Sequence, residues 1–191
     1  MWKIEDEEQY FDIKAVEIMT RKKRGVMGEF PELLVKEKPM KFKYIKLFDG
    51  KLGIYLPEGQ GDNEHIGSKY YYPSEMNEYM EYITEDNQYY ITVEKLICDN
   101  TNLSEFAEEI CDDIDDVYED AIAKVTREYV EKDLEIAEIF VVVTGDIDCF
   151  AWIFVIKKDE DIFRLYFSCE CENKDAMAEM AYKVVENIDI V

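Results

Sequence analysis

The sequence contains a single histidine, His65, and this scarcity limits the catalytic chemistry open to the chain. Catalysis by a serine or cysteine nucleophile needs a neighbouring general base, which is most often a histidine. His65 lies between Gly61 and Gly67, beside Glu64, in a stretch typical of a surface loop, and no cysteine is near it in the sequence. We therefore expect no catalytic residues and interpret the chain as a protein without enzymatic activity.

Motifs for nucleotides and metal ions are also missing. Neither Gly-x-x-x-x-Gly-Lys-Ser/Thr nor Gly-x-Gly-x-x-Gly occurs, so no nucleotide cofactor is indicated. Cys169 and Cys171 would share a strand face, but without a second cysteine pair they favour reduced core thiols over a zinc site. Residues 145–148 and 112–120 are rich in carboxylates and lack the spacing of an EF-hand loop. We expect no cofactor and no bound metal.

Long apolar runs are absent as well. No apolar stretch reaches the length of a transmembrane helix, so we expect no membrane insertion. Residues 1–8 lack the basic and apolar segments of a signal peptide, and the five cysteines are scattered and odd in number. Thiols in that pattern are typical of a reducing compartment. We therefore expect a cytoplasmic protein.

Positive charge is scarce and unevenly distributed. The chain has 22 Lys and Arg against 45 Asp and Glu, a net charge of −23. Residues 1–51 carry a balance of +2, whereas residues 52–191 carry −25. Because contacts to phosphates need positive charge, we expect the main body to bind no nucleic acid. A basic or apolar protein partner suits this charge better.

The negative charge is densest at the end of a predicted helix. Six carboxylates occur within nine residues, namely Asp112, Asp113, Asp115, Asp116, Glu119 and Asp120. The helix dipole disfavours negative charge at a C-terminus, so the cluster has a local cost and no structural reason evident in the sequence. It is a candidate acidic patch for a partner, with a solvated acidic surface as the alternative.

Three strands and a helix are predicted at the C-terminal end. In the second strand, residues 150–156, both alternating faces are apolar, which indicates cover on both sides; residues 136–144 show the same pattern. In the third, residues 162–170, one face is apolar and the other is expected to be mostly solvated. The short connections predict antiparallel neighbours. Apolar residues then recur at helical spacing up to Ile188, after a predicted N-cap at Asn173.

The earlier part of the chain divides into two regions. Residues 43–56 predict a hairpin around Asp49-Gly50, and a helix is predicted to begin at Asn102, with Glu105 in a capping-box position. Residues 1–40 fit both a strand and a helix, and Pro31 and Pro39 are interpreted as bracketing a linker. We therefore expect an N-terminal extension of residues 1–40 and one domain of residues 41–191.

Half of the tyrosines fall within 21 residues. They are Tyr70, Tyr71, Tyr72, Tyr79, Tyr82, Tyr89 and Tyr90. Tyrosine supplies rigid contact area with a polar tip and is enriched at interfaces, so this block is a candidate partner-binding surface. The alternative is that alternating tyrosines are ordinary strand surface and core.

The order of elements resembles the PsbP/DcrB-like fold. A hairpin ending in Leu56-Pro57-Glu58-Gly59 is followed by strands, a capped helix, a three-strand meander and a C-terminal amphipathic helix. The resemblance covers residues 42–190. The family includes the photosystem II extrinsic protein, the Mog-type Ran-release factor and the Eag chaperones of type VI secretion. It implies an α+β fold, an antiparallel sheet with helices packed on both faces, and binding without catalysis.

Together these observations predict a non-enzymatic, cytoplasmic binding module, adaptor or chaperone-like, that engages a protein or peptide partner. A secreted effector and a basic toxin are the partner classes considered. The alternative function is an acidic immunity or inhibitor protein directed against a basic toxin. The oligomeric state is left open, with a homodimer as one alternative.

Overall fold

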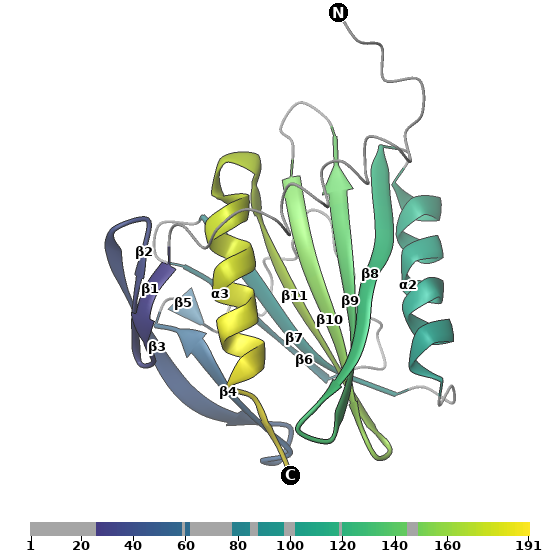
Figure 1. The fold of residues 1–191 in the computed structure, drawn as a ribbon, viewed down its shortest axis with the longest axis horizontal. Helices are drawn as coiled ribbons and strands as arrows, with labels where there is room; N and C mark the ends of the chain where they lie inside the picture. Colours follow the sequence, from purple (N-terminus) through teal and green to yellow (C-terminus); the bar gives the residue numbers. More distant parts are fainter. Residues whose placement is uncertain are drawn as a thin grey trace, which may run out of the picture.

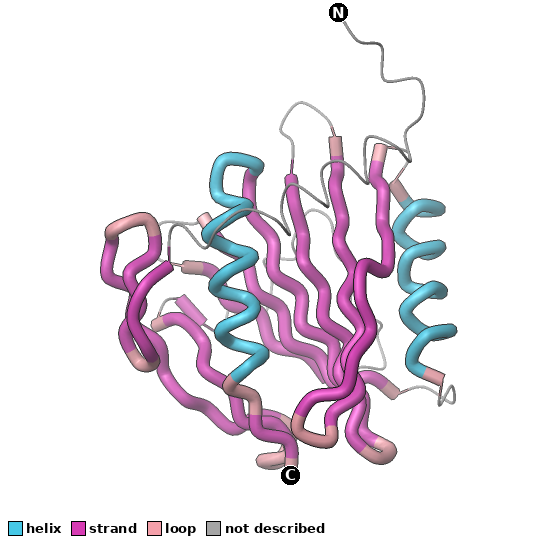
Figure 2. The backbone as a smooth tube through the Cα atoms, in the orientation of Figure 1, coloured by secondary structure: helices cyan, strands magenta, loops and turns pink. Residues whose placement is uncertain are grey.

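The structure is a computed structural model that describes residues 26–58, 60–61, 78–84, 88–97, 102–118, 120–144 and 149–191 (Figure 1). The strands are β1 (Val26–Glu29), β2 (Glu32–Val35), β3 (Lys38–Leu47), β4 (Leu52–Pro57), β5 (Gln60–Gly61), β6 (Glu78–Ile83), β7 (Tyr89–Leu96), β8 (Ala121–Glu131), β9 (Leu134–Val143), β10 (Cys149–Lys158), β11 (Asp161–Glu170) and β12 (Asp189–Ile190). The helices are α2 (Leu103–Val117), η1 (Cys171–Asn173, a 3-10 turn) and α3 (Lys174–Glu186). Strands predominate in this part of the chain (Figure 2).

The strands form two antiparallel sheets. The large sheet has seven strands in the order β5-β6-β7-β11-β10-β9-β8, and the small sheet has five in the order β1-β2-β3-β4-β12. The predicted meander is confirmed, because β10 pairs with β9 on one side and with β11 on the other. The expectation of one sheet holds only for the large one, because the predicted hairpin at Asp49-Gly50 belongs to the small sheet.

Residues 26–40 are part of the folded body. Where the sequence suggested a linker between Pro31 and Pro39, the chain forms β2 and enters β3. The side chains of Val26, Leu33 and Val35 are buried in the main core. The strands of the small sheet therefore begin before residue 41, where the domain was expected to start. Residues 1–25 lie outside the described ranges.

One face of the large sheet, the small sheet and α3 share the main core. The strand side chains on this face include Phe140, Trp152, Phe154 and Phe167, all of which are buried. In Figure 1, α3 lies between the two sheets, and seven of its residues are buried. This buried stripe includes Met180, at the spacing that the sequence predicted.

The opposite face of the large sheet contributes to a second cluster, which contains α2. Ala151, Ile153 and Val155 of β10 point to this side, as expected from the alternation of side chains along a strand. Ile162 and Tyr166 of β11 are also buried here, so the solvated face predicted for this strand is wrong. In Figure 1, α2 runs beside β8, on the side of the molecule away from the small sheet. No helix within the described ranges is long and apolar enough to cross a membrane.

Candidate functional site

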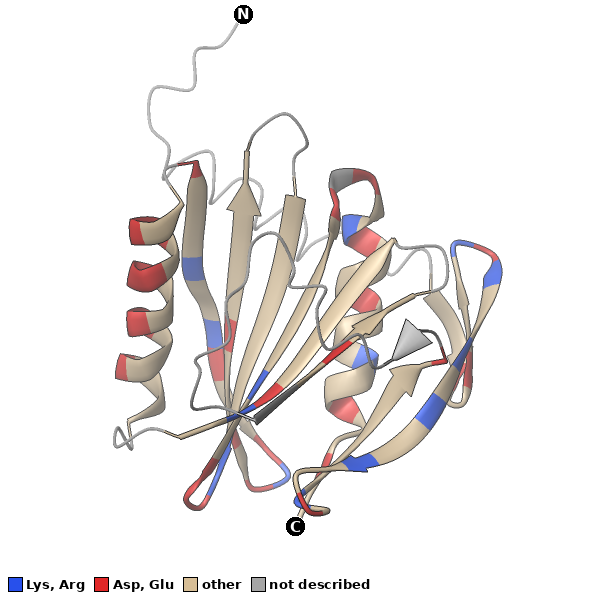
Figure 3. Ribbon diagram, turned by 180° about the vertical axis from the view of Figure 1, so that it is seen from behind, with Lys and Arg blue, Asp and Glu red and all other residues tan. Residues whose placement is uncertain are grey.

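The predicted acidic patch lies on the last two turns of α2. Asp112, Asp113, Asp115 and Asp116 are exposed there, Asp120 is exposed just beyond the helix, and Glu119 lies outside the described residues. Acidic positions line the outer side of this helix in Figure 3. Asp115 has a structural role that the sequence did not reveal, because its carboxylate accepts a hydrogen bond of 3.0 Å from the backbone N–H of Ala123. This bond joins the helix to β8.

The helix is capped at its start and buries no side chain fully in its last six residues. The side chain of Asn102 accepts hydrogen bonds from the backbone N–H groups of Ser104 and Glu105, so the predicted N-cap is confirmed. Leu103, Ala107, Ile110 and Cys111 are buried, but all four lie in the first nine residues of the helix. Further on, Ile114 is half-buried and Val117 is 62% exposed.

A cavity of about 280 Å³ lies between the end of this helix and the large sheet. We call it the α2 pocket. Its lining residues are Ile110, Asp113, Ile114, Asp116, Val117 and Tyr118 from α2 and its C-cap, and Val141, Val143, Ile153, Arg164 and Tyr166 from the sheet. Most of the lining is aliphatic, Tyr118 and Tyr166 add two aromatic rings, and two carboxylates of the acidic patch stand at the rim. The helix and three neighbouring strands thus form one concave site.

The single cation in the pocket lining is already neutralised. Arg164 of β11 donates from Nε and Nη2 to Oε2 of Glu94 on β7, over 2.9 and 2.6 Å. Glu94 is fully buried, and the Arg164 side chain is 15% exposed. Because the pair sums to zero charge, Asp113 and Asp116 set the sign of the potential at the pocket. The site is therefore suited to an apolar group that is attached to positive charge.

The thiol beside the pocket is not arranged for catalysis. Cys111 is buried, and burial together with the carboxylates of Asp115 and Asp112 raises the pKa of its thiol to about 12. A thiol must lose its proton to act as a nucleophile. Within the described ranges, no group of three or more His, Cys, Asp or Glu side chains is placed to hold a metal ion.

The predicted tyrosine block does not form one exposed surface among the residues that can be placed. Tyr70, Tyr71 and Tyr72 lie outside the described residues, and of Tyr79 only the backbone in β6 is described. Tyr89 is buried in the main core, and half-buried Tyr82 packs against that core. Half-buried Tyr90 lies on the opposite face, because it directly follows Tyr89 in β7. Tyr89 is thus a core residue, and a partner-binding role for the others stays a prediction.

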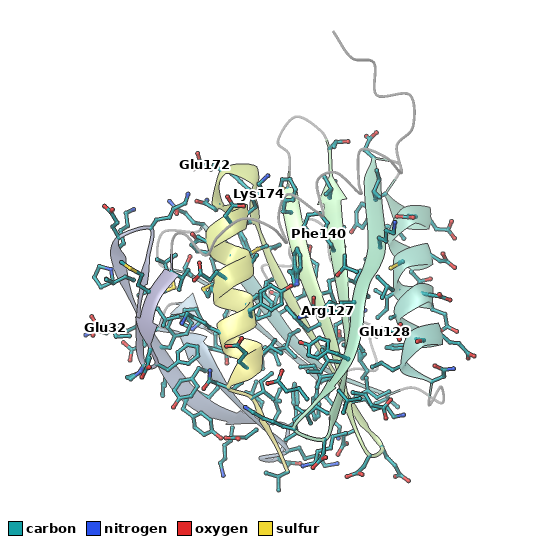
Figure 4. All side chains as sticks on the ribbon, in the orientation of Figure 1. Glu32, Arg127, Glu128, Phe140, Glu172 and Lys174 are labelled. Atoms are coloured by element: carbon teal, nitrogen blue, oxygen red, sulfur yellow. The ribbon has the colours of Figure 1, made fainter. Side chains whose placement is uncertain are left out.

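A second buried carboxylate, Glu138, lies beneath α3 and was also missed by sequence reasoning. Glu138 is fully buried among the apolar side chains of β9, although it carries a carboxylate. Arg127 of β8 donates to its Oε1 from Nη2 over 2.5 Å, and the hydroxyl of Tyr182 on α3 donates to Oε2 over 3.0 Å. The Arg127 guanidinium also lies over the ring of Tyr129, at 4.3 Å. Arg127 is labelled in Figure 4. The only signal in the sequence was the position of Glu138, which alternation places on the same face of β9 as Ile136 and Phe140.

Similarity to known proteins is confined to the fold. No known protein family matches the sequence, and no curated protein sequence is significantly similar to it. The structure is similar to the solution structure of cyanobacterial PsbP (CyanoP) from Synechocystis sp. PCC 6803, with a TM-score of 0.56 and 11% identity, covering 78% of this chain and 92% of that chain. It is also similar to a crystal structure of a protein of unknown function, a putative regulator, from Pseudomonas aeruginosa, with a TM-score of 0.44 and 5% identity, covering 74% and 91%. The first comparison confirms the expected PsbP-like fold.

Proposed function

We propose that this chain is a non-enzymatic binding module whose α2 pocket takes an apolar side chain from a basic segment of a partner protein. The observation that carries the proposal is a mostly apolar cavity with Asp113 and Asp116 at its rim and a neutralised arginine in its lining. Apolar burial supplies affinity, and the carboxylates select a positively charged neighbourhood around the anchor. An adaptor or chaperone-like role in the cytoplasm is part of this proposal.

The fold as a whole gives only general support to the proposed binding function. The PsbP-like arrangement is compatible with binding without catalysis, and kinship with DcrB-like, Mog-type or Eag-type proteins remains a prediction. Helices on both faces of the sheet, as in the expected sandwich, would place the pocket between one helix layer and the sheet. The local geometry of α2 carries the argument, because its last turns expose Val117 and leave the cavity beneath them.

The test uses defined peptides and fluorescence anisotropy. The probe is a short labelled peptide with one leucine between lysines, compared with the same peptide carrying serine at the leucine position. Burying the leucine is worth about 1.5–3 kcal/mol, so we expect the leucine peptide to bind roughly 10- to 100-fold more tightly. Equal affinity of the two peptides would contradict the proposal.

Protein variants separate the rim from the rest of the helix. D113N/D116N removes two exposed charges worth about 0.2–1 kcal/mol each, and we expect the affinity to fall roughly 2- to 30-fold, with a weaker dependence on salt. The matched control, E108Q/E109Q, removes two exposed carboxylates of the same helix that do not line the pocket. The control should bind like the unmodified protein.

A second candidate function is an acidic inhibitor, such as an immunity protein, that covers a basic toxin. It is favoured by the row of exposed carboxylates on α2 rather than by the cavity. In that case E108Q/E109Q would weaken binding of a basic protein as much as D113N/D116N. V117S, which alters an exposed residue of the pocket lining, would then have no effect. Loss of peptide affinity in V117S favours the pocket.

A further inference from the structure

A second pocket, at the foot of α3, has the opposite charge. Its cavity volume is about 380 Å³, and it is lined by residues of β3, β4 and β12, of the β8–β9 turn and of the end of β10. Three lysines from three separate segments line it, namely Lys46 of β3, Lys132 of the β8–β9 turn and Lys158 at the end of β10. We call this the lysine pocket. Basic positions along β3, in the small sheet, contrast with acidic α2 across the molecule in Figure 3.

Two of the lysines donate hydrogen bonds to the protein itself and still have N–H donors available for a ligand. Lys132 Nζ donates to the carbonyl of Glu186 over 2.6 Å, and Lys158 Nζ donates to the carbonyl of Ile190. Positive charge near the end of α3 is favourable to its dipole. Each ammonium group has three N–H donors and these bonds use one, so two donors on each lysine remain for another acceptor.

Lys46 has no comparable structural role within the described part of the chain. Its side chain is exposed on β3, and no hydrogen bond or ion pair to another described residue holds it there. It adds a third positive charge to a cavity in a chain whose net charge is −23. Like charges around one cavity repel each other, so an anion bound among the three ammonium groups would relieve their repulsion.

The carboxylate in the lining, Asp189, is already engaged. Tyr44 donates a hydrogen bond of 3.0 Å from its hydroxyl to Oδ2 of Asp189. The phenol reaches Asp189 across Gly53, where any Cβ atom would collide with the Tyr44 hydroxyl. Hydrogen bonding to Asp189, and then burial, raise the pKa of Tyr44 above its ordinary value. Among the side chains that line the pocket, three lysines against one aspartate give an excess of two positive charges.

We propose that the lysine pocket binds a small organic dianion, with phosphate monoesters as the favoured chemical class. Lysine ammonium groups act as point charges that suit phosphate, and the excess charge matches a dianion. The buried side chains of Leu134, Ile188 and Ile190 give the cavity apolar walls for the organic part of the ligand. The volume lies within the range of small-molecule sites. This inference is independent of the α2 pocket.

The experiment follows backbone amide resonances of the full chain while phenyl phosphate is added at constant ionic strength. We expect saturable shifts at Gly50, Gly53 and Asp189, and smaller ones with the monoanion benzoate. K46Q should weaken phenyl phosphate binding about 5- to 10-fold, as expected for one lost charge-assisted contact. The matched control is K43Q, which removes an exposed lysine of the same strand that does not line the cavity.

Two results would overturn the proposal. The first is a linear, unsaturated response that chloride reproduces at the same ionic strength. The second is an equal loss of affinity in K46Q and K43Q, because this would show that only the general charge of the strand matters. Peptide binding at the α2 pocket should be unchanged in K46Q, so failure here leaves the proposed function untouched.

Discussion

The two faces of the large sheet carry the same ionic motif in different surroundings. On the α3 side, buried Glu138 of β9 pairs with Arg127 of the neighbouring β8. On the other side, buried Glu94 of β7 pairs with Arg164 of the neighbouring β11. Beneath α3 the helix adds the hydroxyl of Tyr182 to the pair, whereas Arg164 lines the α2 pocket.

The difference shows which helix is available for binding. α3 buries seven residues, six of them within the main core, so it cannot separate from the sheet without exposing that core. α2 is two residues longer but buries four, and its charged end stands over a cavity. A surface that a partner can use must be accessible without unfolding the domain. The α2 pocket meets this condition, and the sheet surface beneath α3 does not.

The largest expected effect comes from breaking the pair beneath α3. Arg127→Met leaves the Glu138 carboxylate buried without its cation, which should cost roughly 3–5 kcal/mol of unfolding free energy, measured by urea denaturation. The double variant Arg127→Met/Glu138→Leu should recover most of this loss, because no buried charge remains. Arg164→Met with Glu94→Leu provides the same cycle on the other face. If either Arg→Met variant lost almost no unfolding free energy, the carboxylate of that pair would be solvated, and the two faces would not carry equivalent buried ion pairs.

The parts of the fold that carry clear periodicity were predictable, and two tight turns without glycine were not. Strands β9 to β11 and helix α3 follow from alternation and from the spacing of apolar residues. The β2–β3 hairpin was missed because its turn residues, Lys36 and Glu37, both have positive φ angles. Asn-Gly is the usual signal for such a turn, and Lys-Glu gives none. Lys132 and Asp133 join β8 to β9 in the same way, so β8 was missed too.

The candidate site was only partly predictable, because its parts meet across the fold. The acidic rim is visible in the sequence as a cluster, but the partners of Arg164 and Asp115 are 70 and 8 residues away. Asn173 was correctly placed at the start of α3. Its side chain makes no cap hydrogen bond and instead accepts one from Lys36. Contacts of this kind follow from strand order, which a single sequence does not contain.

Alkaline pH should lower the unfolding free energy through the tyrosines around Glu138, by less than the loss of Arg127 does. Burial, and then the negative charge of Glu138, raise the pKa values of Tyr182 and Tyr129 above the usual tyrosine value near 10. The unfolded chain then loses these protons first, so the stabilisation is complete below about pH 10 and is lost as the pH rises further. Tyr182→Phe should cost about 1–3 kcal/mol at neutral pH and flatten this dependence. Urea denaturation at several pH values measures both; an unchanged slope in Tyr182→Phe would argue against the assignment.

The smallest effect should be a local loosening of α2. Asn102→Ala removes the N-cap and should cost about 1 kcal/mol, roughly a 5-fold change in the opening equilibrium of this helix. Cys111 reports that opening, because its burial and its pKa of about 12 protect the thiol until the helix detaches. Thiol labelling followed by peptide-resolved mass spectrometry should therefore show faster modification of Cys111 in Asn102→Ala. Buried Cys169, in the main core beneath α3, is the internal control and should label at its original rate. Equal acceleration at both thiols would mean that α2 opens only with the whole domain, and the α2 pocket would then lose the independence that sets it apart from the α3 side.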